Sequence, residues 1–246
     1  MNEHVPQVFV GTMYCGEGDY DKCCRAILEQ KGVSIQHKTI ANQPEKEAHN
    51  RLWQSWRSVQ HSGFDMFVKV DADTVLAHDE VLLGLWRMMR DDPKITGIQA
   101  PLLDYFTDGY IAGLNCFSPR VTFRDTADEL FCDRQVDVDH ERVVKGDGCP
   151  VQLRPAGYHC FGSTDAQAFH FGLHRQLKNQ TLVINAVRSA WLRHKDRPRA
   201  LALLGAQAVS VFSGSGFNYI DDRFQQAFVA TLHRYDELVK ELETTP

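Results

Sequence analysis

The chain of 246 residues is long enough for one large α/β domain, with or without a helical appendix. With 43% hydrophobic and 24% charged residues, it has the composition of a globular protein and not of a disordered or fibrous one. A net charge of −5 argues against general nucleic-acid binding, and no apolar run reaches the roughly 20 residues of a membrane span. The polar N-terminus lacks signal-peptide features, so we expect a cytoplasmic protein whose seven cysteines are reduced.

Strands and helices alternate in the N-terminal part of the predicted fold. Residues 8–13 form an apolar strand, and a loop with two glycines follows at 14–18. After a helix, residues 33–40 alternate between polar and apolar positions as a second strand. The next helix starts near Glu45 and buries an apolar stripe that includes Trp56. This order of elements predicts an α/β sheet.

Two aspartates follow the next predicted strand, residues 66–70. In an extended strand end, Asp71 and Asp73 point to the same side. Two carboxylates at one point repel each other unless a cation or a proton lies between them. Oxygen ligands suit Mg²⁺ or Mn²⁺, which share their shell with phosphates of a bound ligand. Because open α/β sheets bind ligands at the carboxyl ends of their strands, the pair predicts a metal–diphosphate site.

The same aspartates have a plainer interpretation. An aspartate commonly ends a strand and caps the helix that follows, and the spacing alone favours that reading. Lys69 lies one residue inside the strand and needs a partner if it is buried. That partner is either a carboxylate or a phosphate of a bound ligand, so Lys69 is a candidate ligand-binding residue.

The remaining pattern predicts further strands and then helices. A strand at 96–103 is expected near a sheet edge because it contains Pro101, and a short strand is expected at 151–153. Helices are expected beyond these strands, at 182–192, 198–211 and 221–242. We therefore expect an α/β domain over residues 1–180 and a helical extension packed on it over residues 181–246.

The order of these segments resembles a known enzyme family. A helix with Glu47-Ala48-His49-Asn50, followed by a strand that ends in Asp71-Ala72-Asp73, is similar to the nucleotide-sugar half of a GT-A-fold, family-2-like glycosyltransferase. Its DxD motif matches residues 71–73. Residues 157–163 and 167–175 are similar to a histidine-bearing segment of a bacterial branch of these enzymes. The resemblance implies a Rossmann-like mixed sheet flanked by helices, with the catalytic domain at 1–180.

The resemblance also implies an activity. The enzyme would transfer a sugar from a nucleoside-diphosphate sugar, with a UDP-sugar as the first expectation, to a glycan, lipid-linked or other acceptor. A Mn²⁺ or Mg²⁺ ion at Asp71 and Asp73 would neutralise the diphosphate leaving group. His159 stands where family members place a histidine that closes the metal shell, and imidazole suits Mn²⁺ better than Mg²⁺. A hydrogen-bonded loop histidine is the alternative.

Family positions give the other candidate residues. The loop after the first strand holds the nucleotide in this family, so Thr12 and Glu17 are candidates, and Asn50 matches a frequent nucleotide-holding asparagine. Inverting transfer needs a carboxylate as general base, and position favours Asp137 or Asp139. Other acidic residues of this region stay open as the base: Asp128, Asp133 and Asp147. The family's usual Glu-Asp pair is absent, so the inverting outcome also stays open.

Acceptor binding and two other functions complete the sequence-based hypotheses. The aromatic and acidic loop at 104–110 is expected to face the acceptor, and the basic region 188–199 is a candidate for contact with an anionic acceptor or a membrane face. A nucleotidyltransferase is an alternative, although the loop at 14–18 has no basic residue for a phosphate. An inactive nucleotide- or sugar-binding module is the other.

Overall fold

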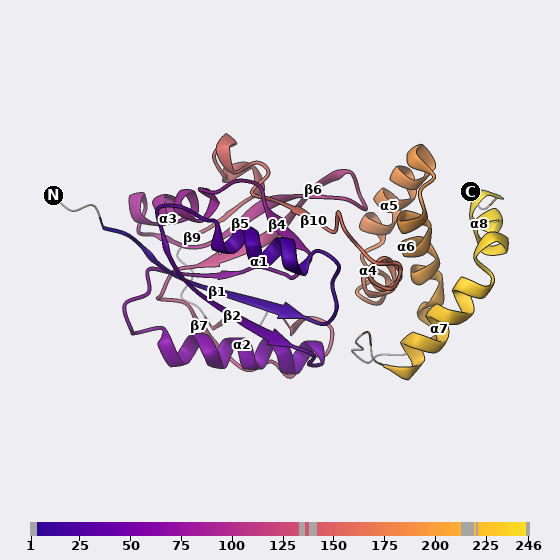
Figure 1. The fold of residues 1–246 in the computed structure, drawn as a ribbon, viewed down its shortest axis with the longest axis horizontal. Helices are drawn as coiled ribbons and strands as arrows, with labels where there is room; N and C mark the ends of the chain where they lie inside the picture. Colours follow the sequence, from indigo (N-terminus) through magenta and orange to yellow (C-terminus); the bar gives the residue numbers. More distant parts are fainter. Residues whose placement is uncertain (1–3, 133–135, 138–141, 213–218, 220, 245–246) are drawn as a thin grey trace. The chain divides into compact units, whose positions relative to one another are not determined.

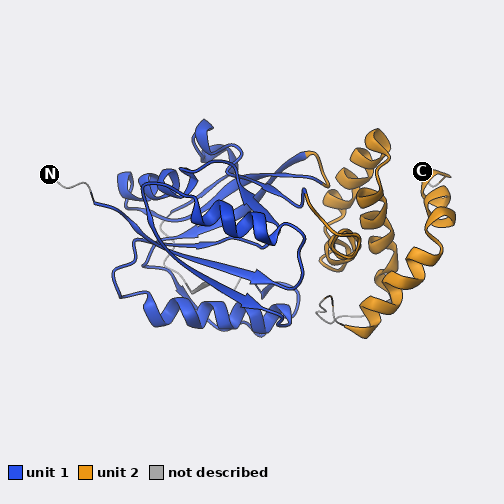
Figure 2. Ribbon diagram, in the orientation of Figure 1, with its two compact units in different colours: residues 1–105, 109–161 blue, residues 106–108, 162–246 orange. Residues whose placement is uncertain are grey.

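The computed structural model describes residues 4–132, 136–137, 142–212, 219 and 221–244. The chain forms two compact units (Figure 2). Unit 1 comprises Met1–Tyr105 and Gly109–Phe161, and unit 2 comprises Phe106–Asp108 and Gly162–Pro246. This division falls earlier in the chain than residue 180. A catalytic domain that spans residues 1–180 stays a prediction.

Unit 1 is built on a mixed β-sheet, which confirms the fold class expected from the sequence. Its strands in the described part of the chain are β1 (Gln7–Tyr14), β2 (Ser34–Ala41), β3 (Met66–Lys69), β4 (Thr74–Leu76), β5 (Ile95–Asp104), β6 (Gly109–Phe117), β9 (Arg142–Lys145) and β10 (Gly157–His159). Their order is β2-β1-β3-β6-β5-β10-β4, and β9 also pairs with β5 (Figure 1). β1 is parallel to β2 and β3, whereas β6 is antiparallel to β3 and β5.

Strand alternation divides the core of unit 1 between the two faces of the sheet. Val10 and Val68 belong to the cluster that includes residues of α1 (Tyr20–Leu28) and α3 (Val81–Asp91). Phe9 and Phe67 point the other way, into the cluster beneath α2 (Glu45–Val59). There Trp56 stacks on Phe67 with ring centroids 5.2 Å apart. Helices α1 and α2 therefore cover opposite faces of the sheet (Figure 1).

Strand β5 lies inside the sheet, so the edge position predicted from Pro101 is wrong. β6 pairs with β5 on one side, and β9 and β10 pair with it on the other. The register of the β5–β6 pair shifts between Ala100 and Pro101, and an irregularity of this kind accommodates a residue without an N–H. The carbonyl of Pro101 still accepts the N–H of Ala156 at 2.8 Å.

Residues 151–153 form a short 3₁₀ helix, and the strand predicted there is wrong. Pro150 and Pro155 flank this segment, and neither offers an N–H for a strand ladder. The side chain of Val151 is exposed instead of packed in a sheet. The strands that pair with β5 on this side are β9 and β10.

Unit 2 is helical in its described part. Its helices are α4 (Asp165–Leu177), α5 (Thr181–His194), α6 (Arg197–Gln207), α7 (Asp222–His233) and α8 (Tyr235–Thr244). The single helix predicted over 221–242 is thus two helices with a break at Arg234. Helices α4 and α6 approach closely at two glycines: a Cβ added at Gly172 would lie 1.6 Å from the carbonyl oxygen of Ala202, and one at Gly205 would lie 2.0 Å from that of Phe169.

The short segment Phe106–Asp108 belongs to unit 2 although it lies between β5 and β6 in the sequence. Phe106 is fully buried and stacks on Phe171 of α4 with ring centroids 4.3 Å apart. Asp108 accepts hydrogen bonds from Arg193 at 2.9 Å and from His194 at 2.7 Å. It also pairs with Arg199 of α6. Unit 2 is therefore assembled from two separate stretches of chain.

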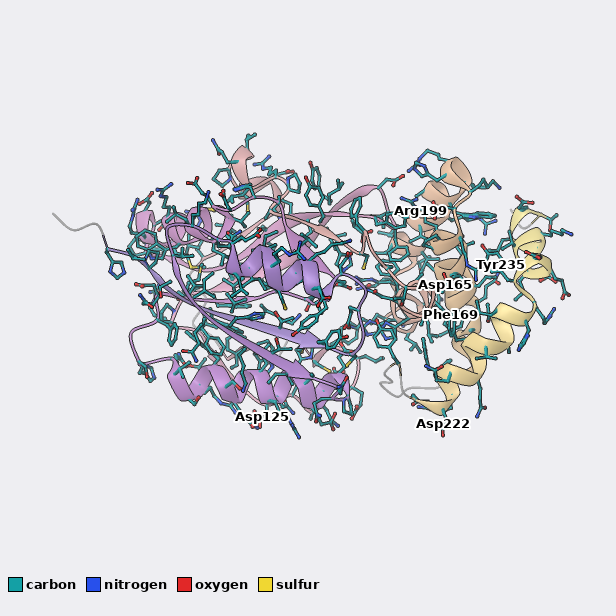
Figure 3. The ribbon with its side chains drawn as sticks, viewed as in Figure 1. Asp125, Asp165, Phe169, Arg199, Asp222 and Tyr235 are labelled. Atoms are coloured by element: carbon teal, nitrogen blue, oxygen red, sulfur yellow. The ribbon has the colours of Figure 1, made fainter. Side chains whose placement is uncertain are left out.

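Cations of the basic region 188–199 pair with acidic groups of unit 2. Beyond the pairs with Asp108, Arg197 binds Asp165 at 2.8 Å and Lys195 binds Glu243 at 3.1 Å. Asp165 is labelled in Figure 3. Contact of this region with a membrane or an anionic acceptor stays a prediction. None of the helices in the described residues has the length and apolar character needed to cross a bilayer.

Candidate metal and active site

The two aspartates of the predicted motif lie in the turn between β3 and β4. The N–H of Val70 donates to the carbonyl of Gly11 at 3.0 Å, which still ties this residue to β1. The chain then turns, and the N–H of Thr74 donates to the carbonyl of Asp71 at 2.9 Å. Asp71 and Asp73 therefore follow a central strand of the sheet directly.

Asp71 forms an ion pair with Lys69. The ammonium of Lys69 is almost completely buried, and its Nζ contacts Asp71 Oδ1. Burial acts to raise the pKa of Asp71, but the Lys69 charge and hydrogen bond outweigh it, and His49 and His159 add to the lowering. The pKa of Asp71 is therefore below its usual value. Of the two partners considered for Lys69, the structure supplies the carboxylate, and a phosphate contact stays a prediction.

Asp73 lies against His159 and Cys160. His159 Nε2 is 3.5 Å from Asp73 Oδ1, and Cys160 Sγ is 3.2 Å from Asp73 Oδ2. The backbone N–H of Cys160 also donates to the carbonyl of Asp73 at 2.9 Å. The three residues place one ligand-type atom each within 4.8 Å of the others. They come together because β10 is antiparallel to β4, with His159 opposite Thr74.

Asp104 fixes the ring of His159 from the other side. Its side chain is fully buried, and Oδ1 lies 2.7 Å from His159 Nδ1. The parallel register of β5 and β10 sets His159 opposite Asp104. A carboxylate on one ring nitrogen, with the other nitrogen facing a second ligand, is typical of metal-binding histidines. The sequence-based assignment of Asp104 to an acceptor-facing loop is wrong, because it is buried on the strand.

The donor set at Asp73 fits a divalent cation. A carboxylate oxygen and a neutral imidazole nitrogen suit Mn²⁺, whereas the thiol of Cys160 is a softer donor than Mn²⁺ or Mg²⁺ prefers. Asp71 is not one of the three grouped residues, and its carboxylate pairs with Lys69. The structure thus brings together Asp73 and His159, two of the three expected ligands. Their role in binding a metal stays a prediction.

The pKa of Glu17, in the loop after β1, is affected by the charges of Asp71 and Asp73. Its Oε2 accepts the backbone N–H of Cys15 at 2.7 Å. Burial, followed by the charges of Asp73 and Asp71, raises the pKa of Glu17 to about 7, although the hydrogen bond from Cys15 opposes the rise. Glu17 is therefore close enough to interact electrostatically with both aspartates. A cation bound among these carboxylates would lower the pKa of Glu17 again.

The two other nucleotide-binding candidates are engaged with the protein. Thr12 is fully buried on β1, and its Oγ1 lies 3.0 Å from His37 Nε2. Asn50 brackets the backbone of Thr126, donating to its carbonyl at 3.1 Å and accepting its N–H at 2.7 Å. These contacts hold a strand and a loop in place, and nucleotide binding by Thr12 and Asn50 stays a prediction.

The general base also stays a prediction. Asp137 lies on the short strand β8 (Val136–Asp137), where its backbone pairs with Thr122 of β7 (Thr122–Phe123). Asp139 and Asp133 lie outside the described residues. Among the other candidates, Asp128 uses Oδ1 to accept the N–H groups of Leu130 and Phe131. The contact of Asp104 with His159 and that of Cys160 with Asp73 could not be predicted from the sequence, because both depend on strand register.

Comparisons with known proteins find a structural likeness but no matching family. No protein-family model matches the chain, and no curated protein matches it. Among solved structures, the chain is similar to the mannosyltransferase PcManGT from Pyrobaculum calidifontis in complex with GDP-Man and Mn²⁺. The match covers 98% of this chain and 79% of that one, with a TM-score of 0.38 and 11% sequence identity.

Proposed function

We propose that the protein is a divalent-metal-dependent glycosyltransferase that moves a sugar from a nucleoside-diphosphate sugar to an acceptor. The observation that carries this proposal is the meeting of Asp73 and His159 at the end of β3, beside the Lys69–Asp71 ion pair. The DxD resemblance of residues 71–73 supports the same assignment. The position at the carboxyl end of a sheet strand is where α/β sheets bind their ligands.

In this proposal, Asp73 and His159 Nε2 hold a Mn²⁺ or Mg²⁺ ion, and Asp71 faces the donor with its orientation set by Lys69. When bound, the ion neutralises the charge that develops on the diphosphate leaving group. Asp104 keeps the proton of His159 on Nδ1, because a carboxylate only accepts, and this leaves the Nε2 lone pair for the metal.

The finer assignments belong to the same proposal. Glu17, Thr12 and Asn50 line the nucleotide side, and Asp137 or Asp139 removes the proton of the acceptor hydroxyl. The transfer then inverts the sugar configuration. A UDP-sugar is the first donor to test, and glycan and lipid-linked acceptors follow.

The test is a screen of nucleotide sugars for Mn²⁺-dependent hydrolysis by the full chain. We expect release of a nucleoside diphosphate from one donor, and we expect Asp73→Asn to reduce this rate by about 100-fold or more. Asp79→Asn is the matched control, because Asp79 is an acidic surface residue paired with Lys31. An Asp73→Asn protein with normal Mn²⁺-dependent turnover would refute the metal role.

Two further measurements separate the alternatives. Calorimetry of UDP binding with and without Mn²⁺ shows whether a nucleoside diphosphate binds through the metal. Metal-dependent binding without hydrolysis or transfer would favour an inactive binding module. Release of pyrophosphate from a nucleoside triphosphate would favour a nucleotidyltransferase.

A further inference from the structure

A second group of metal-ligand side chains lies at the first turns of α2. Glu45, His49 and Cys132 place one ligand atom each within 4.8 Å of the others. Glu45 and His49 are four residues apart, so they share one face of the helix. Cys132 comes from a segment far along the chain. This group shares no residue with the group at Asp73.

His49 has one ring nitrogen that is arranged for a ligand. The side chain is 3% exposed, and Nδ1 lies 2.9 Å from the backbone carbonyl oxygen of Glu45. A carbonyl only accepts, so Nδ1 carries the proton and Nε2 presents a lone pair. Nε2 is buried and has no hydrogen-bond partner in the described part of the structure. A buried acceptor of this kind is destabilising unless something binds it.

Cys132 lies beside His49 because the preceding residues, 125–129, bind to side chains of α2. Four contacts join residues 125–129 to this helix: Arg57 to Asp125 at 2.7 Å, Gln54 to Asp125 at 3.1 Å, Asn50 to the backbone of Thr126, and Lys46 to Glu129. Figure 3 shows Asp125 at α2. Cys132 itself is fully buried, and its thiol donates to the carbonyl of Asp128 at 3.1 Å. The buried packing and these contacts with α2 therefore hold the thiol of Cys132 near His49.

The donor atoms indicate which metal would bind. A carboxylate oxygen, an imidazole nitrogen and a thiolate sulfur are the ligands of Zn²⁺, whereas Mg²⁺ and Ca²⁺ select oxygen. Three protein ligands with a water as the fourth give the tetrahedral geometry that Zn²⁺ adopts. His49 also follows the usual pattern for such a ligand, because its second ring nitrogen donates to a backbone carbonyl.

We propose that Glu45, His49 Nε2 and Cys132 bind a Zn²⁺ ion, with water as the fourth ligand. Binding forms the zinc–thiolate bond, breaks the S–H bond and releases its proton to solvent. The hydrogen bond from Cys132 to Asp128 is exchanged for that bond. The ion then ties the first turns of α2 to residues 125–132. This site is independent of the glycosyltransferase proposal.

Cobalt titration of the metal-free full chain tests the site. Co²⁺ replaces Zn²⁺ in tetrahedral sites, and a bound thiolate gives a charge-transfer absorption in the near ultraviolet. We expect one equivalent of Co²⁺ to produce this absorption and Zn²⁺ to abolish it. Cys132→Ser should remove the thiolate band. His49→Gln should weaken binding by more than the roughly 10- to 100-fold that loss of an outer-shell partner costs.

Cys160→Ser is the matched control, because it removes the thiol of the group at Asp73 and should leave the band unchanged. A band that survives Cys132→Ser and disappears in Cys160→Ser overturns the proposal, as does a wild-type protein that shows no thiolate band with excess Co²⁺. If Cys132→Ser does not fold, Zn²⁺-dependent thermal stabilisation decides. It should occur in wild type and Cys160→Ser and be absent in His49→Gln. None of these readouts depends on sugar transfer.

Discussion

The buried pair of Asp104 and His159 makes the sharpest prediction for the candidate active site. Asp104→Asn keeps the shape of the side chain and removes its charge. The asparagine amide then either accepts the Nδ1 proton more weakly or turns its NH₂ group toward Nδ1. In the second case the histidine proton moves to Nε2, which can no longer accept a metal.

The size of the effect follows from the geometry. The Oδ1–Nδ1 distance is 2.7 Å, and the Asp104 side chain is fully buried, so no water substitutes for the lost carboxylate. Loss of such an outer-shell partner costs about 10- to 100-fold in metal affinity, which corresponds to about 1.4–2.7 kcal/mol. We expect Mn²⁺ affinity to fall by this factor while the circular dichroism spectrum is unchanged.

The assay is a Mn²⁺ titration of metal-free full chain, in which free Mn²⁺ is followed by electron paramagnetic resonance. The same substitution is then made in a His159→Gln background, where it should have no further effect. Wild-type Mn²⁺ affinity in Asp104→Asn would refute the reasoning. An equal loss in both backgrounds would also refute it, because Asp104 would then act through the fold and not through His159.

Three further predictions concern stability. The pKa of Glu17 is about 7 in the folded chain, against an ordinary value of 4.5. Between these two pH values the folded state keeps a proton on Glu17 that the unfolded state has lost. The free energy of unfolding therefore falls as pH rises through this window. Glu17→Gln should therefore be more stable than wild type at pH 8, by at most about 3 kcal/mol, and equal to it at pH 4 in metal-free urea titrations; equal stabilities at pH 8 would contradict this. Gly172→Ala forces α4 and α6 apart and should cost about 1–3 kcal/mol in denaturant titrations, whereas the control Gly84→Ala, whose Cβ lies 3.1 Å from a leucine methyl, should stay within about 1 kcal/mol of wild type. Arg199→Ala removes the buried partner of Asp108 and Asp196. Because both carboxylates reach solvent and Asp108 keeps Arg193 and His194, we expect a cost of about 1–3 kcal/mol; a thermal midpoint equal to that of wild type would show that these ion pairs contribute nothing.

Elements with a strong local pattern could be read from the sequence. α1 and α2 have their apolar stripes at helical spacing, and β3 is a compact apolar run, so their positions follow from neighbouring residues alone. β10 is only three residues long, too short for any periodicity. Residues 151–153 are equally short, and the prolines that flank them offer no N–H for pairing, so the apolar residues there indicated a strand wrongly.

The candidate site divides in the same way. The location of Asp71 and Asp73 after a buried strand is local information, and so is the Lys69–Asp71 pair. The partners of His159 are not local. They depend on the register of β10 against β4 and β5, and register is set by the packing of the whole sheet.

The position of residues 106–108 in the chain limits how this protein can be divided into fragments. A fragment that starts at residue 162 would carry every helix of the C-terminal part that the structure describes, yet it would lack the ring that stacks on Phe171. It would also leave Arg199 without Asp108, one of its two carboxylates. The helices are therefore not a self-sufficient module, because residues 106–108, which precede them in the chain, supply the buried ring of Phe106 and a carboxylate partner for Arg199.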